Sequence, residues 1–173
     1  MEHFPPSTPL ECDSIAVRYR QSSMAGMELE VGDKRLLSNW PEWPSQPAAW
    51  TWLDGSRYEL SIDANHATVA TNDQPTFDML AGQLEWPKPH ARWRVLPSRE
   101  TALLIRTVGR SLSLDSARFQ FESADGQGIA TLDMRRLVHQ RRAALADFSG
   151  NARDLNLIWA YLNALGRRQT FYC

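Results

Sequence analysis

Short runs in which every second residue is apolar recur along this chain, and their period limits the folds that it can adopt. The first three runs cover residues 15–19, 27–31 and 58–62. Successive side chains of a β-strand point to opposite faces of its sheet, so a period of two predicts strands with one buried face. Asp54-Gly55 comes before the third run and is typical of tight turns between antiparallel strands. We expect the first two runs to pair as an antiparallel hairpin.

More strands follow in the rest of the chain. Residues 67–71 are expected to return beside 58–62, and further strands are predicted over residues 92–96, 102–108, 117–122 and 129–132. The last two flank Asp125-Gly126, which is a strong hairpin signal. The strands therefore predict a curved, mostly antiparallel sheet or partial barrel.

Three segments are predicted to be helices. Pro75 suits the first position of a short helix over residues 75–85, in mid-chain. Apolar residues recur with the helical period over residues 133–148 and again over 152–165, where they mark one stripe. Gly166 is expected to end the last helix. The predicted fold class is α+β, with the sheet covered by two C-terminal helices and accompanied by the short mid-chain helix.

The length of 173 residues suits a single domain. We expect a poorly ordered, Pro-rich N-terminal arm over residues 1–13 and one α+β domain over residues 14–173. The hydrophobic fraction is 43% and the charged fraction is 23%, as in ordinary globular proteins. No apolar run is long enough for a transmembrane helix, and no basic start followed by an apolar run indicates a secretory signal. These observations predict a cytoplasmic protein.

The sequence contains no motif that indicates an enzyme class. It has no His-Glu-x-x-His motif, no Gly-x-Ser-x-Gly elbow, no phosphate-binding loop and no Gly-x-Gly-x-x-Gly motif. The two cysteines, Cys12 and Cys173, are expected to be separate thiols, and no cysteine pair has the spacing of a zinc site. We therefore predict no catalytic residues, no metal and no cofactor, and the absence of motifs favours a protein without enzymatic activity.

Tryptophan and proline are concentrated in two stretches, residues 39–53 and 86–93. Tryptophan is enriched at the centres of interfaces because it buries a large area with few rotatable bonds, and proline holds a loop in one shape. One interpretation is a candidate partner surface; the other is that these rings cover the edge of a β-rich core. The candidate residues are Trp40, Trp43, Trp50, Trp52, Trp86 and Trp93.

The basic residues are unevenly distributed. Arginine accounts for 17 of the 19 basic side chains, a bias that is typical of GC-rich coding and points to a bacterial protein. Residues 1–100 carry 9 basic and 14 acidic side chains, whereas residues 101–173 carry 10 basic and 6 acidic ones. Four arginines of the predicted 133–148 helix form a candidate surface for anions: Arg135, Arg136, Arg141 and Arg142. Pairing with the acidic half of the chain is the alternative.

These features predict a non-enzymatic binding or adaptor protein that contacts an unidentified protein partner through its Trp-Pro loops and its Arg-rich helix. Two alternatives stay open. One is a small-ligand-binding protein or enzyme whose site is assembled in the interior of the sheet. The other is a weak binder of anionic lipid or nucleic acid. The sequence predicts no oligomeric state.

Overall fold

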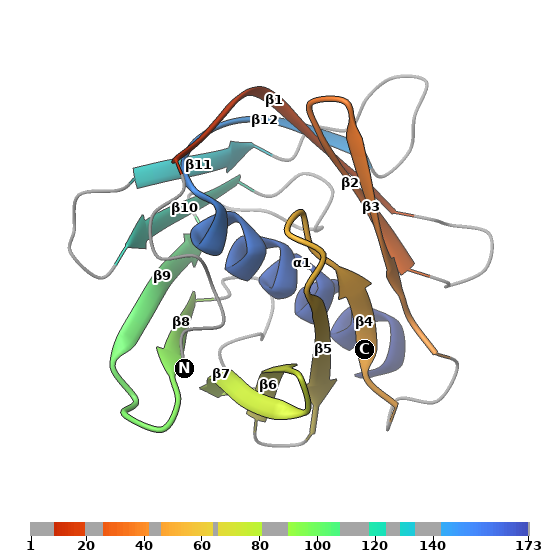
Figure 1. The fold of residues 1–173 in the computed structure, drawn as a ribbon, viewed down its shortest axis with the longest axis vertical. Coiled ribbons are helices and arrows are strands. Elements are labelled where there is room, and N and C mark those ends of the chain that lie inside the picture. Colours follow the sequence, from red (N-terminus) through yellow and green to blue (C-terminus); the bar gives the residue numbers. More distant parts are fainter. Residues whose placement is uncertain are drawn as a thin grey trace.

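One antiparallel sheet of 12 strands and one α-helix make up the described part of the chain. The structure is a computed structural model, and it describes residues 9–19, 26–41, 46–63, 66–80, 90–107, 118–123, 129–133 and 143–172. The helix lies across the hollow of the curved sheet (Figure 1). None of the helices in this part of the chain is both long and apolar enough to cross a membrane.

The strands follow one another around the sheet almost entirely in chain order. They are β1 (Pro9–Tyr19), β2 (Gly26–Val31), β3 (Lys34–Asn39), β4 (Ala48–Thr51), β5 (Arg57–Ile62), β6 (His66–Thr71), β7 (Gln74–Leu80), β8 (His90–Val95), β9 (Thr101–Thr107), β10 (Arg118–Ser123), β11 (Ile129–Asp133) and β12 (Ala143–Asn151). The spatial order is β11-β10-β9-β8-β7-β6-β5-β4-β3-β2-β1-β12, so only the last strand leaves the chain order. Strands β11 and β12 come close to each other, but no described register joins them, and the sheet is open.

The period-two runs are strands, as predicted. Strands β1 and β2 form an antiparallel pair, and Tyr58 of β5 lies opposite Thr71 of β6. Strands β10 and β11 form the third expected hairpin. Gly55 has a φ of 86°, a conformation that favours glycine and explains the tight turn before β5. The alternation of apolar residues therefore located these strands correctly.

The mid-chain helix predicted over residues 75–85 is not present. Residues 74–80 form β7, which pairs with β6, and residues 81–85 lie outside the described residues. Asn72 and Asp73 both have positive φ, 52° and 63°, so they form the tight turn of a two-residue hairpin instead of a helix cap. Phe77 is buried and Leu80 is 47% exposed, although a helix would have placed both on one face.

The prediction of a first C-terminal helix over residues 133–148 is also wrong for the described residues of that range. Residues 143–148 belong to β12, which pairs with β1 along nearly its whole length, and residues 134–142 lie outside the described residues. The free edge of β1 supplies backbone hydrogen-bond partners that a local periodicity cannot reveal. The same pairing includes Pro9 opposite Asn151 and Cys12 opposite Phe148, so residues 9–13 of the expected arm are part of β1.

The last predicted helix is confirmed, but it is longer and more deeply buried than expected. Helix α1 covers Ala152–Tyr172 and contacts β2, β5 and β12. Every residue from 154 to 167 is buried, so the helix has no solvent-exposed face over that length. A helix buried on all sides normally has an apolar circumference. Here the buried positions include Asn156 and Asn163, whose polar groups need partners.

Gly166 lies inside α1 and does not end it. A Cβ atom at this position would lie 2.5 Å from Cη2 of Trp40, well inside van der Waals contact. The absence of a side chain therefore lets the indole ring of Trp40 pack directly on the helix backbone. This close packing explains a glycine in the interior of a helix, where it costs about 1 kcal/mol relative to alanine.

Gly166→Ala tests this packing. Helix propensity alone would stabilise the variant, whereas the contact with Trp40 predicts a loss of about 1–3 kcal/mol in the free energy of unfolding, as for other overpacked cores. Urea unfolding measures the sign. In the double variant with Trp40→Phe the loss should shrink, because the smaller ring leaves room for the methyl group. A stabilised Gly166→Ala variant would contradict the packing argument.

Candidate functional site

The candidate tryptophans lie mostly in the core. Trp40, Trp50, Trp52 and Trp93 are between 0% and 9% exposed, and Trp43 and Trp86 lie outside the described residues. All four of these tryptophans are therefore packed in the core. Trp40 and Trp93 face the helix, and Trp50 and Trp52 line a pocket that opens to the surface.

Three of these indole rings donate their N–H groups to α1. Trp50 Nε1 donates to Oδ1 of Asn156 at 2.9 Å, and Trp93 Nε1 donates to the carbonyl oxygen of Leu157 at 2.9 Å. Trp40 Nε1 donates to Oδ1 of Asn163 at 2.8 Å. A buried polar group is costly unless it is hydrogen-bonded. The tryptophans therefore supply donors to three oxygen atoms of the helix while their rings fill the space around it.

The side chain of Asn163 forms three buried hydrogen bonds. Its Oδ1 accepts hydrogen bonds from Trp40 and from Oγ of Ser38, and its Nδ2 donates to the carbonyl oxygen of Trp159 at 2.8 Å. The hydroxyl of Ser38 also lies 3.3 Å from the backbone nitrogen of Met27, which donates to it. This network connects β2, β3 and α1 in one buried site.

The candidate anion surface cannot be placed. Arg135, Arg136, Arg141 and Arg142 lie outside the described residues, and the binding of anions through them stays a prediction. The interior of the sheet, which was the alternative location for a ligand site, is occupied by α1 in the described structure.

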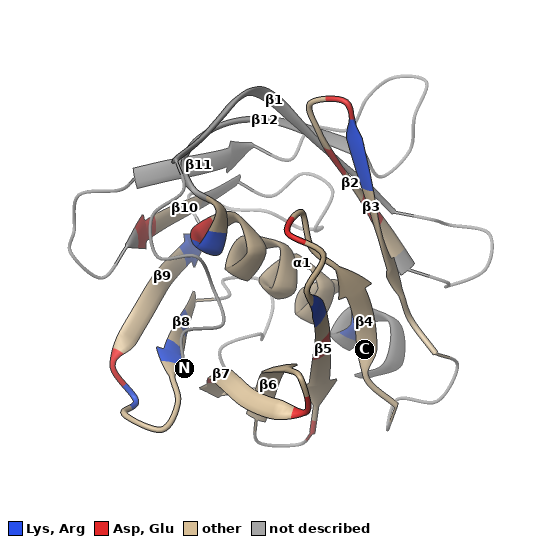
Figure 2. Cartoon of the chain, in the orientation of Figure 1, with Lys and Arg blue, Asp and Glu red and all other residues tan. Residues whose placement is uncertain are grey.

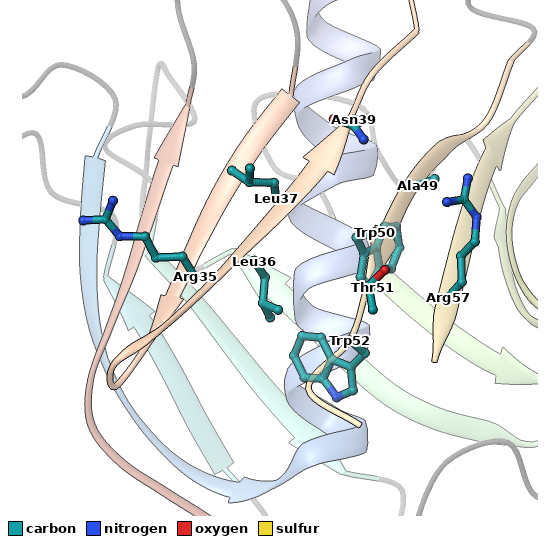
Figure 3. A pocket seen from close by; sticks show the side chains of 9 residues that line it. All are labelled: Arg35, Leu36, Leu37, Asn39, Ala49, Trp50, Thr51, Trp52 and Arg57. Carbon is teal, nitrogen blue, oxygen red and sulfur yellow. The ribbon is translucent and has the colours of Figure 1, made fainter. Parts of the chain in front are cut away.

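The sheet has a local opening between β3 and β4. The two strands share a single register pair, Asn39 opposite Ala49, although both continue beyond it. Figure 3 shows them converging at this pair and diverging from there toward Arg35 and Trp52. We call this opening the β3–β4 slit. An uninterrupted ladder would have placed Leu37 opposite Thr51 as the next hydrogen-bonded pair.

Backbone groups face each other unpaired across the slit. The backbone of alternate residues in an antiparallel sheet points to alternate neighbours. The N–H of Trp52 bonds to Ser56 on the β5 side, so Thr51 directs its N–H and C=O toward β3. Val31 and Lys34 form the pair that closes the β2–β3 hairpin, so the backbone groups of Lys34 and of every second residue after it point toward β2. Leu37 lies between two such residues, and its backbone groups therefore point toward β4. No register pair joins these two residues.

Residues from both faces of the sheet line the slit, which has a volume of about 370 Å³. The outer rim is exposed and includes Arg35, Leu37, Thr51 and Arg57, whereas Leu36, Trp50 and Trp52 come from the side that faces the helix. Neighbouring residues of one strand point to opposite faces, and both sets line this pocket because it lies where β3 and β4 diverge. Trp50 and Trp52 are 2% and 3% exposed, so a molecule in the slit would lie at the outer side of the sheet and contact only a small part of these residues.

The charges at the slit are two arginines on opposite rims. Arg35 contacts Glu28 at 3.5 Å and Glu30 at 3.4 Å, and Arg57 contacts Glu59 at 3.7 Å, in each case through Nε. Both arginine side chains are about two-thirds exposed, at 69% and 67%. Figure 2 places these charges on the strands around the slit and at the adjacent turns. Exposed ion pairs of this kind contribute 0–1 kcal/mol, so they restrain the guanidinium groups only weakly.

Tyr58 supports the floor of the slit from the neighbouring strand. Its ring stacks on Trp50, with ring centroids 6.1 Å apart and an interplanar angle of 22°. Burial, with a smaller contribution from the charge of Asp54, raises the pKa of Tyr58 to about 12. The hydroxyl is therefore protonated near neutral pH and is not poised for proton transfer.

The lining has the chemistry of a binding site. Most of its side chains are apolar. The polar lining residues are Asn39, Thr51 and the two arginines. None of the carboxyl or imidazole groups in the described part of the chain lines this pocket. The residues that the structure describes also contain no cluster of three or more His, Cys, Asp or Glu side chains that could hold a metal ion. Sequence reasoning identified Trp50 and Trp52 but missed Arg35 and Arg57, because no local pattern marks a break in strand pairing.

Asn163→Leu should destabilise the protein by about 2 kcal/mol or more in urea unfolding, since it leaves two buried donors, the indole of Trp40 and the hydroxyl of Ser38, without their acceptor. Asn156→Leu is the matched control. It removes the acceptor of Trp50 alone, and it also removes an amide nitrogen that has no hydrogen-bond partner in the described structure. Equal or reversed losses for the two variants would contradict the role assigned to Asn163.

The pKa of Tyr58 predicts a loss of stability at high pH. The unfolded chain releases this proton near pH 10, whereas the folded chain holds it to about pH 12, so the stabilisation is complete below pH 10 and falls between pH 10 and 12. At pH 11 the loss is about 1 kcal/mol. Urea unfolding at pH 9 and pH 11 should show a smaller decrease for Tyr58→Phe than for the wild type. An identical decrease would contradict the assignment.

Comparison of the chain with protein-family models, with curated proteins and with solved structures finds no match.

Proposed function

We propose that this chain is a binding protein without catalytic activity, and that the β3–β4 slit is its binding site for a small amphipathic molecule. The observation that carries the proposal is the lining of one pocket by residues from both faces of the sheet. A molecule entering from the surface would lie over Trp50 and Trp52, which are 2% and 3% exposed, without displacing α1. The proposal keeps the expected use of the Trp-Pro stretch, because residues 39–53 supply five of the lining residues.

The size and composition of the slit support a small ligand. Its volume of about 370 Å³ falls within the range of about 300–1,000 Å³ that is typical of ligand pockets. Such pockets combine an apolar lining with a few polar groups that fix the orientation of the ligand. Leu36, Trp50 and Trp52 supply the apolar floor, and Thr51 supplies a hydroxyl at the rim.

A second candidate is an extended segment of a partner protein. The unpaired backbone groups of Leu37 and Thr51 favour it, because an added strand gains affinity from main-chain hydrogen bonds. A full strand needs about 4.8 Å on each side, and the pair of Asn39 and Ala49 closes one end of the slit. A narrower molecule would fit without separating β3 from β4, so the small ligand is the preferred proposal.

The test uses N-phenyl-1-naphthylamine, a neutral aromatic dye that fluoresces in apolar sites. The wild type should bind it, and Leu37→Trp should reduce the affinity at least tenfold, because the larger ring fills the mouth of the slit. Leu37 is 44% exposed, so the substitution does not disturb the core.

Leu80→Trp is the matched control for this experiment. Leu80 is 47% exposed and lies on β7, outside the slit, so this variant should bind the dye as the wild type does. The proposal fails if the wild type does not bind the dye or if the two variants behave alike. Binding of extended peptides in the absence of dye binding would support the partner-protein candidate instead.

A further inference from the structure

We infer that the ligand of the β3–β4 slit carries a carboxylate head group, which Arg57 and Thr51 bind at the rim while the apolar part lies on the floor of the slit. The inference rests on the proposed function and specifies the chemical class of the ligand. Three observations carry it: the sign of the charges that line the slit, the exposed hydrogen-bond donors of Arg57, and the position of Thr51 opposite Arg57.

The first observation is the sign of the lining charges. Arg35 and Arg57 are the charged residues that line the slit, and none of the described acidic residues lines it. The acidic side chains nearby, Glu28, Glu30 and Glu59, lie beyond the arginines on the neighbouring strands. A head group at the rim would therefore meet the guanidinium groups before it met a carboxylate of the protein.

The second observation separates the two arginines. Arg35 lies between two glutamates, which offset its charge. Arg57 has a single ion pair through Nε at 3.7 Å, longer than the 2.7–2.9 Å of a strong charge-assisted hydrogen bond. The contact with Glu59 is made through Nε, so a ligand could bind the Nη1 and Nη2 atoms of this 67% exposed side chain. Paired guanidinium N–H groups match the geometry of a carboxylate, which makes Arg57 the better anion ligand.

The third observation is the neighbour of Arg57. Thr51 lies directly opposite it in the β4–β5 register, and both side chains are exposed on the outer face. Side chains of directly opposite residues in an antiparallel pair lie about 5 Å apart at Cβ, within reach of one shared ligand group. The guanidinium of Arg57 extends toward Ala49, and the hydroxyl of Thr51 is a neutral donor on the same outer face (Figure 3). Figure 3 shows both residues on the β4 side of the slit, across from Arg35.

Acidic groups near this head-group site limit its strength but do not occupy it. Glu59 contacts Arg57 through Nε, and the carboxylate of Asp54 accepts a hydrogen bond from the backbone N–H of Ser56 in the adjacent turn. Neither contact uses the terminal nitrogens of Arg57. A monovalent carboxylate is therefore favoured over a head group of higher negative charge, which these two side chains would repel.

The test measures displacement of N-phenyl-1-naphthylamine by three eight-carbon compounds that differ only in head group: octanoate, octanol and octylammonium. At pH 7.5 octanoate should displace the dye from the wild type at about one-tenth of the octanol concentration, and octylammonium should be weaker than octanol. Hydrogen bonds between charged groups have a net strength that corresponds to a factor of this size.

Variants test which residues cause the preference for octanoate over octanol. Arg57→Gln should make octanoate and octanol equivalent as competitors of the dye, whatever its effect on the affinity for the dye itself, and Thr51→Val should reduce the preference for octanoate severalfold. Arg35→Gln is the matched control: it lines the same slit but is neutralised by two glutamates, so the preference should persist. Thermal unfolding of each variant verifies that the fold is retained.

The outcomes separate this inference from the proposed function. If octanol and octanoate displace the dye equally from the wild type, the slit binds amphipathic molecules but the carboxylate inference is overturned. The same conclusion follows if Arg35→Gln removes the preference and Arg57→Gln retains it. If the wild type does not bind the dye, the proposed function fails, and the head-group inference fails with it.

Discussion

The rest of the structure depends on burying a helix that carries polar groups inside a curved sheet. Helix α1 is buried on every side from residue 154 to residue 167, and it brings Asn156 and Asn163 with it. Each buried amide must find hydrogen-bond partners or cost free energy. Tryptophan suits this requirement because its large ring fills space while its N–H group donates. In the described residues, three of the tryptophans that are concentrated in the two Trp-Pro stretches thus hold the helix in place.

The same requirement shapes the β3–β4 slit. Trp50 is held from one side by Asn156 and from the other by the ring of Tyr58, so its position is fixed by contacts outside the pocket. Trp40 packs against Gly166 and holds the end of β3 near the helix. Between these anchors the two strands pair only at Asn39 and Ala49. At the slit the residues of β4 pack against the helix while β3 and β4 pair only once, and the outer rim is exposed.

Much of the fold could be predicted from the sequence, and the errors have a common cause. The strands were found wherever apolar residues alternate, as at Met27, Leu29 and Val31. The helical predictions over residues 75–85 and 133–148 failed because short segments can match both periods, and pairing with β6 and β1 decided the outcome. Two of the predicted surface tryptophans, Trp50 and Trp52, do line the slit, but Arg57 carries no local signal, since its importance comes from a break in a neighbouring pair of strands.

The sequence by itself determined the strands in which apolar residues alternate, three antiparallel hairpins and the C-terminal helix, because the period of apolar residues records which face of each of these elements is buried. Only the tertiary structure decided where that helix lies, which edge β12 joins and where the sheet opens. These features depend on contacts between segments more than 100 residues apart, such as Trp40 with Asn163 and Cys12 with Phe148. Such contacts are selected by the fit of whole surfaces and by the satisfaction of buried polar groups, and a local pattern encodes neither.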